Sequence, residues 1–245
     1  MSGFIDLHCH PLPAIDDGCR SAHEGAALLC GLASIGFTWV VATPHVRSGM
    51  WNNTRTTIAP AHLALEAALE ELRARGATLP RWDFAAEHLF DDVSWERMTG
   101  EDPLTYPGKA AVLIEFAYER LPERAEVRLW RLSKTFKLRP VIAHPERCAT
   151  LQAEQERLLD IQGAGCALLL DLMSLVGAYG KRAQASAERW LDESRYTAAA
   201  SDAHKPEDVS RVAQAIEALG RRVGPEGVTR LLVDGPKSLL GDAAI

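Results

Sequence analysis

Histidine and acidic side chains follow the apolar runs of this chain at almost every strand-like segment. The first run ends in His8-Cys9-His10. Side chains two apart in an extended segment point the same way, so both histidines can reach one cation. Side chains of the same kind recur after later runs, and together they form one set: His8, His10, Asp17, His45, Glu87, Glu115, His144, Asp202 and His204. The set predicts one metal site that is built from the whole chain.

The composition of this set indicates the metal and the chemistry. Mixed imidazole and carboxylate ligands suit zinc, iron or manganese and do not fit calcium or a copper–thiolate site. So many ligands exceed the needs of one ion, and a bridging carboxylate would let them hold two or three cations about 3.5–4 Å apart. That arrangement favours hydrolysis of a phosphoester. The sequence contains no cysteinyl-phosphate motif, no Gly-x-Ser-x-Gly elbow, no Walker loop and no glycine-rich dinucleotide turn.

Several residues of the same types allow a structural alternative. Asp16 and Asp17 precede Gly18, which is typical of a turn, and we expect Asp17 to bind metal while Asp16 caps the turn. Asp6 is expected to orient a ligand histidine. Taken singly, His45 and His144, each next to a proline, would fit a structural histidine as well as a ligand. The remaining histidines are expected at the surface or behind the ligands: His23, His62 and His88.

The elements that must position these residues alternate along the chain. Strands are expected at 4–8, 38–42, 82–86, 111–115, 140–143, 166–171 and 197–200, and helices at 21–35, 58–75, 123–136, 153–163, 183–193, 206–219 and 225–233. Such alternation predicts a parallel sheet with right-handed crossovers, and seven units suit a closed or distorted α/β barrel. The carboxyl ends of barrel strands open onto one face, which would bring the ligands together. Residues 1–245 are read as one domain, with 44–57 as an active-site loop.

Composition restricts the function classes. The 245 residues are 47% hydrophobic, enough for a large core, and the net charge of -6 argues against nucleic acid as the main partner. Five cysteines, odd in number and without a CxxC pair, favour a reducing cytoplasm over a disulfide framework. No secretory leader is apparent, and no apolar run approaches the roughly 20 residues that cross a bilayer, so membrane insertion is not expected.

Eight short motifs, in order and spacing, resemble one known group of proteins. They are His8-Cys-His10, Ile15-Asp-Asp-Gly18, Ala42-Thr-Pro-His45, Ala86-Glu87, Leu113-Ile-Glu-Phe116, Ile142-Ala-His-Pro-Glu-Arg147, Ser174-Leu-Val-Gly-Ala-Tyr-Gly180 and Ser201-Asp-Ala-His204. The set resembles the polymerase and histidinol phosphatase (PHP) superfamily, and within it the bacterial capsule and exopolysaccharide tyrosine-protein phosphatases of CpsB/YwqE type. The resemblance extends as far as Val233-Asp-Gly-Pro-Lys237.

The resemblance implies a distorted seven-stranded α/β barrel with three metal ions at the carboxyl ends of its strands. It assigns one ion to His8, His10, Glu87 and Asp202, a second to Glu87, Glu115 and His144, and a third to Asp17, His45 and His204. Manganese is the expected metal, with iron, zinc or magnesium as alternatives. Arg147 would contact the phosphoryl group, and Arg147, Glu87 and Asp202 are the expected catalytic residues. The implied substrate is phosphotyrosine on a bacterial tyrosine kinase that controls polysaccharide export.

The chain departs from this branch at two places. A second arginine usually follows the last ligand closely, whereas here Lys205 follows it and the next arginine is Arg211; both, with Arg47, are candidate substrate-binding residues. The sixth strand carries Leu169 and Asp171 where the branch favours Gln and Asn. A small-molecule phosphatase of histidinol-phosphate type and a catalytically weak metal-binding regulatory protein therefore stay as alternatives. The native metal, the substrate and the oligomeric state, including a homo-oligomer, are left open.

Overall fold

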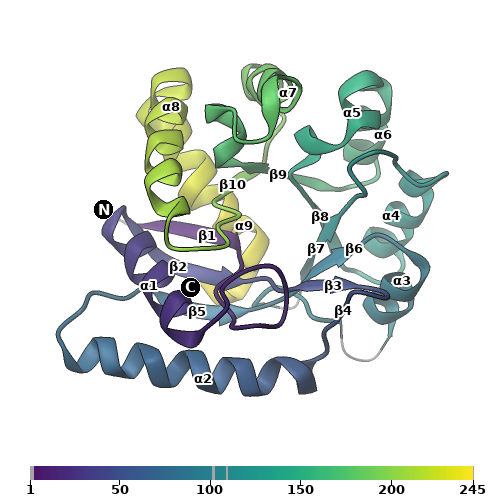
Figure 1. The fold of residues 1–245 in the computed structure, drawn as a ribbon. Coiled ribbons are helices and arrows are strands. Elements are labelled where there is room, and N and C mark those ends of the chain that lie inside the picture. Colours follow the sequence, from purple (N-terminus) through teal and green to yellow (C-terminus); the bar gives the residue numbers. More distant parts are fainter. Residues whose placement is uncertain (1–2, 101–102, 109, 245) are drawn as a thin grey trace.

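Parallel strands alternate with helices along most of the chain, as the sequence predicts, and the helices surround the strands (Figure 1). The computed structural model describes residues 3–100, 103–108 and 110–244. Its longer strands are β1 (Phe4–Cys9), β2 (Phe37–Ala42), β5 (Arg81–Phe84), β7 (Ala111–Glu115), β8 (Arg139–Ala143) and β9 (Ala167–Asp171), followed by the short β10 (Ala198–Ala200). These lie within a few residues of the seven expected strands.

The strands form two sheets. One has the order β1-β2-β5, and the other has the order β10-β9-β8-β7-β6-β3-β4. Every pairing is parallel except that of β3 (His45–Arg47) with β4 (Trp51–Asn52). A parallel bridge from Cys9 to Ala203 links the end of β1 to the segment after β10. The fold is therefore α/β with parallel sheets.

Two short strands that were not expected follow β2 and β5. After β2, the chain passes through Thr43 and Pro44 before β3 begins, and after β5 it passes through two alanines before β6 (Glu87–Leu89). Proline has no N–H to donate to a ladder, which favours the first break. The strand expected at 82–86 therefore ends two residues early, at Phe84, and the prediction of an irregular loop over 44–57 was wrong, because β3 and β4 lie within it. As a result His45 and Glu87 begin strands instead of following them, and they are direct partners in the β3–β6 register.

Most of the helices lie outside the strands and cover their outer faces (Figure 1), whereas the last one contributes Leu239 and Leu240 to the apolar cluster inside the strands. They are α1 (Ala22–Ser34), α2 (Arg55–Ala74), α3 (Asp92–Thr99), α4 (Ala125–Lys134), α5 (Ala149–Ala153), α6 (Gln155–Gly163), α7 (Gly180–Asp192), α8 (Asp208–Thr229) and α9 (Gly235–Leu240). The Ser21 hydroxyl accepts from the backbone N of Glu24 at 3.2 Å, so α1 begins at the expected cap. The sequence missed α3 and predicted one helix at 153–163, where the structure has both α5 and α6.

Most of the expected helix 206–219 and the first part of the expected helix 225–233 lie in α8, which is interrupted at Gly224 and ends at Thr229; residues 230–233 continue as a π-helical segment. There φ is 69° and ψ is 176°, a combination that glycine adopts without steric cost. Within the described residues, no helix combines the length and apolarity that crossing a bilayer requires.

The parallel strands bury both of their faces. On β1, Ile5 and Leu7 belong to an inner apolar cluster, and Val41 of β2 belongs to the same cluster. Their neighbour Val40 lies instead in the larger cluster between strands and helices. Continuous apolar runs such as Ala-Val-Leu-Ile in β7 are typical of strands covered on both sides. This rigid double-sided core fixes the strand ends that carry the polar set.

Candidate metal centre

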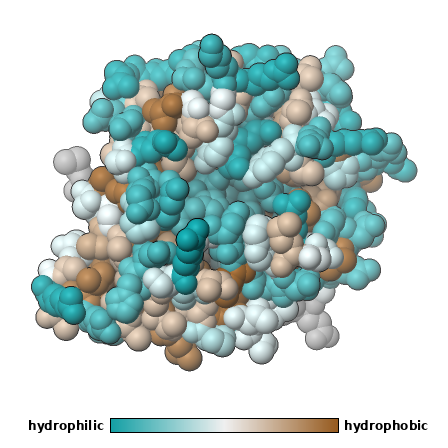
Figure 2. Space-filling view, in the orientation of Figure 1, coloured by the Kyte–Doolittle hydropathy of each residue, from teal (hydrophilic) through white to brown (hydrophobic). Residues whose placement is uncertain are grey.

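The nine predicted ligands come together at one end of the strands. Seven of them are buried, His204 is partly exposed, and Asp17 is exposed. Their nitrogen and oxygen atoms form four groups in which all members lie within 4.8 Å of one another: His10, Asp17, His45 and His204; His8, His144 and Asp202; His8, His10 and Glu87; and His45, Glu87 and Glu115. In Figure 2, hydrophilic residues gather in the hollow at the centre of the face shown.

Glu87 is the centre of this arrangement. Its Oε2 lies 3.1 Å from His8 Nε2 and 2.9 Å from His45 Nδ1, and its Oε1 lies 2.9 Å from His144 Nε2. It is fully buried and takes part in two of the four groups. A carboxylate that reaches imidazoles with both oxygens can bridge two cations.

Asp202 and Asp17 extend the cluster on two sides. Asp202 Oδ1 lies 3.1 Å from His8 Nε2, and His8 Nε2 lies 3.1 Å from His10 Nε2. Asp17 Oδ1 lies 3.3 Å from His45 Nε2 and 3.4 Å from His204 Nε2. The four groups overlap more than the three ligand sets implied by the resemblance, because His8, His10 and His45 each belong to two of them.

Asp16 holds the ring of one ligand. Its Oδ2 lies 2.9 Å from His10 Nδ1 and accepts from the backbone N of His45, while its Oδ1 accepts from the backbone N of Gly18. A Cβ on Gly18 would lie 2.3 Å from the carbonyl oxygen of His10, so only glycine lets this turn close on the ligand. Asp16 thus caps the turn, as expected, and also directs His10 Nε2 toward the cluster.

The other polar residues near the ligands have different roles. Asp6 Oδ1 accepts from the backbone nitrogens of His8 and Ser201, so it fixes the backbone of a ligand histidine. His88 is buried, and both of its ring nitrogens lack a hydrogen-bond partner among the described residues. His23 is exposed, and His62 packs on the rings of Trp82 and Phe84.

Two candidate ligands adopt left-handed backbone conformations. His144 follows β8 with φ of 32°, and Asp202 follows β10 with φ of 49°. Non-glycine residues in this region cost of order 1–3 kcal/mol each and cluster at functional sites. The turns are held by hydrogen bonds from His144 N to Leu169 O and from Asp202 N to His8 O, both 2.9 Å.

The electrostatics of the cluster favour added positive charge. Burial by itself would lower the pKa of His8 and of His45, but neighbouring carboxylates raise these values to about 9 and about 12. In the same way Asp17 raises the pKa of His204 to about 10. The carboxylates therefore hold protons on the imidazoles, and bound cations would supply this charge in their place.

Two further pKa shifts concern the candidate ligands His144 and Glu115. Burial, together with the charge of Arg147, lowers the pKa of His144 to about 4, so its ring is neutral at pH 7 and offers a lone pair. Burial and the charge of Glu87 raise the pKa of Glu115 to about 7. A nearby cation would favour the ionised form of this carboxylate.

Unsatisfied buried atoms test whether these residues fit metal ions. Glu87 Oε2, Glu115 Oε2 and His45 Nδ1 are buried without a hydrogen bond. His45 Nδ1 and Glu87 Oε2 are close, but they are not aligned for one. Such atoms are rare in folded proteins because each costs about 1–3 kcal/mol. The donor set and its orphaned atoms fit divalent cations with mixed nitrogen and oxygen ligands.

Arg147 lies beside the cluster. Its Nη1 donates to Asp202 Oδ2 at 2.6 Å and to Asp171 Oδ2 at 3.4 Å, and its Nη2 donates to the hydroxyl of Tyr118. The guanidinium lies 4.7 Å from the ring centre of Tyr118 and 4.1 Å from that of Tyr179. Two carboxylates and two rings therefore fix its position.

The sequence did not reveal the residues that hold Arg147. Asp171, at the end of β9, was noted only as a departure from the related branch, and Tyr118 and Tyr179 were not singled out. Glu146 is fully buried and accepts from the backbone N of Asp171 and from the hydroxyl groups of Ser174 and Tyr196. Its place beside Arg147 in the His-Pro-Glu-Arg motif was the available signal.

Three cavities border the centre. One of about 250 Å³ is lined by Arg47, Leu89, Glu115, Ala117, Tyr118 and Glu119. One of about 430 Å³ is lined by Asp17, Gly18, Arg20, Glu24, His204, Lys205 and Glu207. One of about 410 Å³ is lined by Tyr118, Arg147, Gln152, Tyr179, Arg182 and Ala183. Arg47 and Lys205 thus lie at the rim of the centre. Arg211 is exposed on α8 and lines none of the three.

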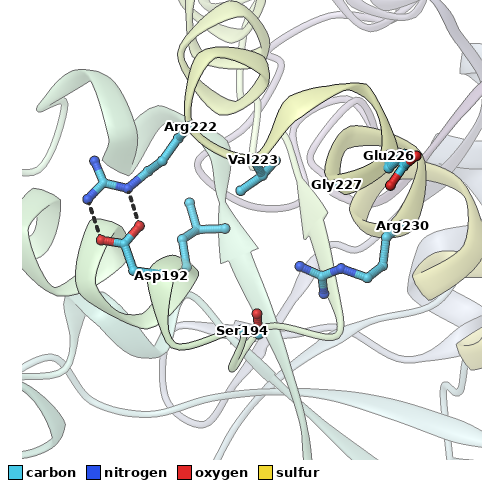
Figure 3. A pocket seen from close by; sticks show the side chains of 8 residues that line it. Asp192, Ser194, Arg222, Val223, Glu226, Gly227 and Arg230 are labelled. Atoms are coloured by element: carbon cyan, nitrogen blue, oxygen red, sulfur yellow. Dashed lines mark hydrogen bonds and ion pairs between the residues drawn. The ribbon is translucent and has the colours of Figure 1, made fainter.

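A cavity of about 520 Å³ lies elsewhere, between the end of α7 and α8 (Figure 3). Its lining includes Asp192 and Arg222, which form two hydrogen bonds of 2.8 and 2.7 Å with each other. None of the nine predicted ligands lines it.

Comparison with known proteins gives one consistent result. Residues 4–241 match the family model described as "Capsular polysaccharide synthesis, CpsB/CapC". The chain is 28% identical over 201 residues to the tyrosine-protein phosphatase YwqE of Bacillus subtilis, covering 82% of this chain and 77% of that protein. It is 25% identical over 248 residues to the tyrosine-protein phosphatase CpsB of Streptococcus pneumoniae, covering 99% of this chain and all of that one.

Solved structures of related proteins also match this chain. The crystal structures of YwqE from B. subtilis and CpsB from S. pneumoniae, described as unique metal-dependent tyrosine phosphatases, include a match with a TM-score of 0.85 and 26% identity. That match covers 96% of this chain and 94% of the other. An amidohydrolase from Mycoplasma synoviae matches with a TM-score of 0.60 and 13% identity over 98% of this chain and 88% of its own. The second likeness concerns the fold alone.

Proposed function

The chain belongs to the CpsB/CapC family of capsular polysaccharide synthesis, and we propose that it is a metal-dependent protein-tyrosine phosphatase. The family expected from the sequence motifs is thereby confirmed. The observation that carries the function is the convergence of nine nitrogen and oxygen ligands in four groups beside Arg147. Relatives named as tyrosine phosphatases support the choice of substrate.

We assign three divalent ions to these residues. The proposed sets are His8, His10, Glu87 and Asp202; Glu87, Glu115 and His144; and Asp17, His45 and His204. Manganese is the proposed metal because the family resemblance implies it, and iron, zinc or magnesium are the alternatives. When bound, such ions generate a nucleophile from water at neutral pH and neutralise charge on the phosphoryl oxygens.

The protein's own part in the reaction is to bind and orient the phosphoryl group. Arg147 would donate to its non-bridging oxygens, and the contacts with Asp202 and Asp171 hold the guanidinium in place before substrate arrives. Asp202 reaches both His8 and Arg147, so it ties the ligand cluster to the arginine. A tyrosine phenolate, with a pKa near 10, leaves with little protonation, which reduces the need for a strong general acid.

The fold supports a distorted seven-stranded barrel in one domain. The bridge from Cys9 to Ala203 brings β1 next to β10, and β2 and β5 continue into β3 and β6 across short breaks. Counting each broken strand once gives seven strand positions around the ligand cluster, as the resemblance implies. We place the whole of residues 1–245 in this domain.

The proposed substrate is phosphotyrosine on a protein, in particular a bacterial tyrosine kinase that controls capsule or exopolysaccharide synthesis. The family's description as one of capsular polysaccharide synthesis supports this setting. Nucleic acid is not a proposed partner, given the net charge of -6. The proposed location is the cytoplasm, because all five cysteines are free thiols.

A comparison of substrates tests the function. Purified protein with manganese should hydrolyse a phosphotyrosine peptide faster than histidinol phosphate, with released phosphate as the measurement. Preference for histidinol phosphate would favour a small-molecule phosphatase built on the same cluster. No turnover of either compound, with metal bound, would favour a regulatory protein.

A further inference from the structure

The cavity beside Arg147 contains cationic but no acidic side chains. Its lining is Tyr118, Arg147, Gln152, Tyr179, Arg182 and Ala183, and its volume is about 410 Å³. Of its two arginines, Arg147 follows β8 and Arg182 belongs to α7. A cavity with two guanidinium groups, one amide and no carboxylate in its lining favours an anion.

The two arginines differ in what they already contact. Arg147 is paired with Asp202 and Asp171, and its guanidinium occupies the space between the rings of Tyr118 and Tyr179. Arg182 is exposed and makes no hydrogen bond or ion pair with the described part of the chain. Because Arg147 fills the aromatic gap, the open part of the cavity suits a charged group better than a second ring.

The other two cavities at the centre have mixed charge, with both acidic and cationic side chains in their linings. The cavity at Arg47 includes Glu115 and Glu119. The cavity at Lys205 includes three carboxylates and two cationic groups among its lining: Asp17, Glu24, Glu207, Arg20 and Lys205. Apart from the proposed metal ligands, Glu119 lines the first cavity and Glu24 and Glu207 line the second, so a negatively charged substrate side chain would meet a carboxylate in either one but none in the lining of the Arg182 cavity.

We propose that the Arg182 cavity binds an acidic side chain of the substrate, close in sequence to the phosphotyrosine whose phosphoryl group lies at Arg147. The inference rests on the proposed function and names the class of peptide that this site selects: acidic sequences around the phosphorylated tyrosine. Arg182 is then a specificity-determining residue supplied by α7, outside the motifs that carry the metal ligands.

The test compares two phosphotyrosine peptides on the manganese-loaded protein. One peptide has Glu at the two positions on each side of phosphotyrosine, and the other has Gln at the same four. Wild-type kcat/KM should be about two- to fivefold higher for the Glu peptide at low salt, the size expected of one exposed ion pair. Arg182→Gln should bring this ratio close to one, and Arg182→Glu should invert it.

Lys181→Gln is the matched control. Lys181 is the exposed neighbour on the same turn of α7, does not line the cavity, and its loss changes the net charge equally. This variant should keep the wild-type ratio. Equal ratios in wild type and Arg182→Gln, or equal losses in both neutralising variants, would overturn the proposal.

Failure of the proposed function would give a different experimental result. Wild-type protein that hydrolyses neither peptide nor free phosphotyrosine would contradict the phosphatase assignment. The cavity would then be judged from binding of the fluorescently labelled peptides, measured by anisotropy. Tighter binding of the Glu peptide that is lost only in the Arg182 variants supports the subsite, and equal affinities for the two peptides overturn it.

Discussion

The metal centre and the cavity between α7 and α8 both contain many charged groups, but they differ in how those charges are compensated. In the α7–α8 cavity, Arg222 pairs with Asp192 (Figure 3). Arg222 also lies 3.3 Å from Glu188, and Arg230 donates to the carbonyl oxygen of Tyr196. These side chains are exposed or half-exposed. In the metal centre, buried atoms of Glu87, Glu115 and His45 lack hydrogen bonds.

This difference shows what distinguishes a functional site from a depression in the surface. The α7–α8 cavity has a volume of about 520 Å³, whereas the three cavities at the metal centre have volumes of about 250–430 Å³. Arg222 and Arg230 of the α7–α8 cavity have protein partners without a ligand. The buried atoms of the metal centre that lack hydrogen bonds would find partners in bound cations, and such perturbed groups in a cleft are typical of active sites.

The largest effect is expected at Glu87, which lies close to four of the imidazoles. Glu87→Gln removes the charge that would bridge two ions. Loss of groups that merely orient metal ligands costs about 10- to 100-fold, so kcat/KM should fall by more than about a hundredfold, together with metal content. His23→Ala, an exposed histidine on α1, is the control and should match wild type in both measurements. Small, equal effects of the two changes would mean that the centre lies elsewhere.

An effect of similar size is expected at Arg147. Removing one preorganised donor to developing charge costs about 3–4 kcal/mol, so Arg147→Ala should lower kcat about a hundred- to thousandfold. Metal content should be measured in parallel, since Asp202 loses its partner in this variant. A near-normal rate with full metal content would show that Arg147 only neutralises Asp202 and Asp171.

The choice of leaving group should have a more moderate effect. Phosphotyrosine should be hydrolysed at least about tenfold faster than phosphoserine in matched peptides, because the phenolate departs with little protonation. Initial rates of phosphate release at saturating manganese give the comparison. Similar rates for the two peptides would remove the tyrosine assignment and leave the metal-dependent hydrolase in place.

The smallest effect is expected in the α7–α8 cavity. Asp192→Asn removes the partner of Arg222, but this pair is exposed and remote from the ligands, and such pairs contribute little. Turnover of phosphotyrosine should stay within about twofold of wild type. A larger loss would indicate that this cavity influences turnover at the metal centre, and the two regions would then not differ in function.

The ligand set could be predicted because it depends on local pattern. Each of the nine residues lies close to the end of an apolar run, and parallel strands bring such positions to one face. The strand breaks at Pro44 and at Ala85 could not be predicted in the same way. Strands of two or three residues, such as β3, β4 and β6, are too short to show a period of two.

The residues that surround Arg147 could not be predicted from the sequence, for a different reason. Asp171, Tyr118 and Tyr179 come from β9, the loop after β7 and the segment before α7, and they meet only when the sheet is assembled. Nothing in the local sequence of any one of them indicates the others. The same holds for Arg182, whose importance depends on which carboxylates are missing from one cavity.

Metal content and turnover, measured together on one preparation, test the central claim most directly. After chelation and gel filtration, the protein should carry little metal and hydrolyse phosphotyrosine peptide at a small fraction of the starting rate. Titration with manganese should restore the rate as metal per chain rises above one, since the proposed centre holds more than one ion. Full activity in excess chelator, with metal far below one ion per chain, would contradict the account.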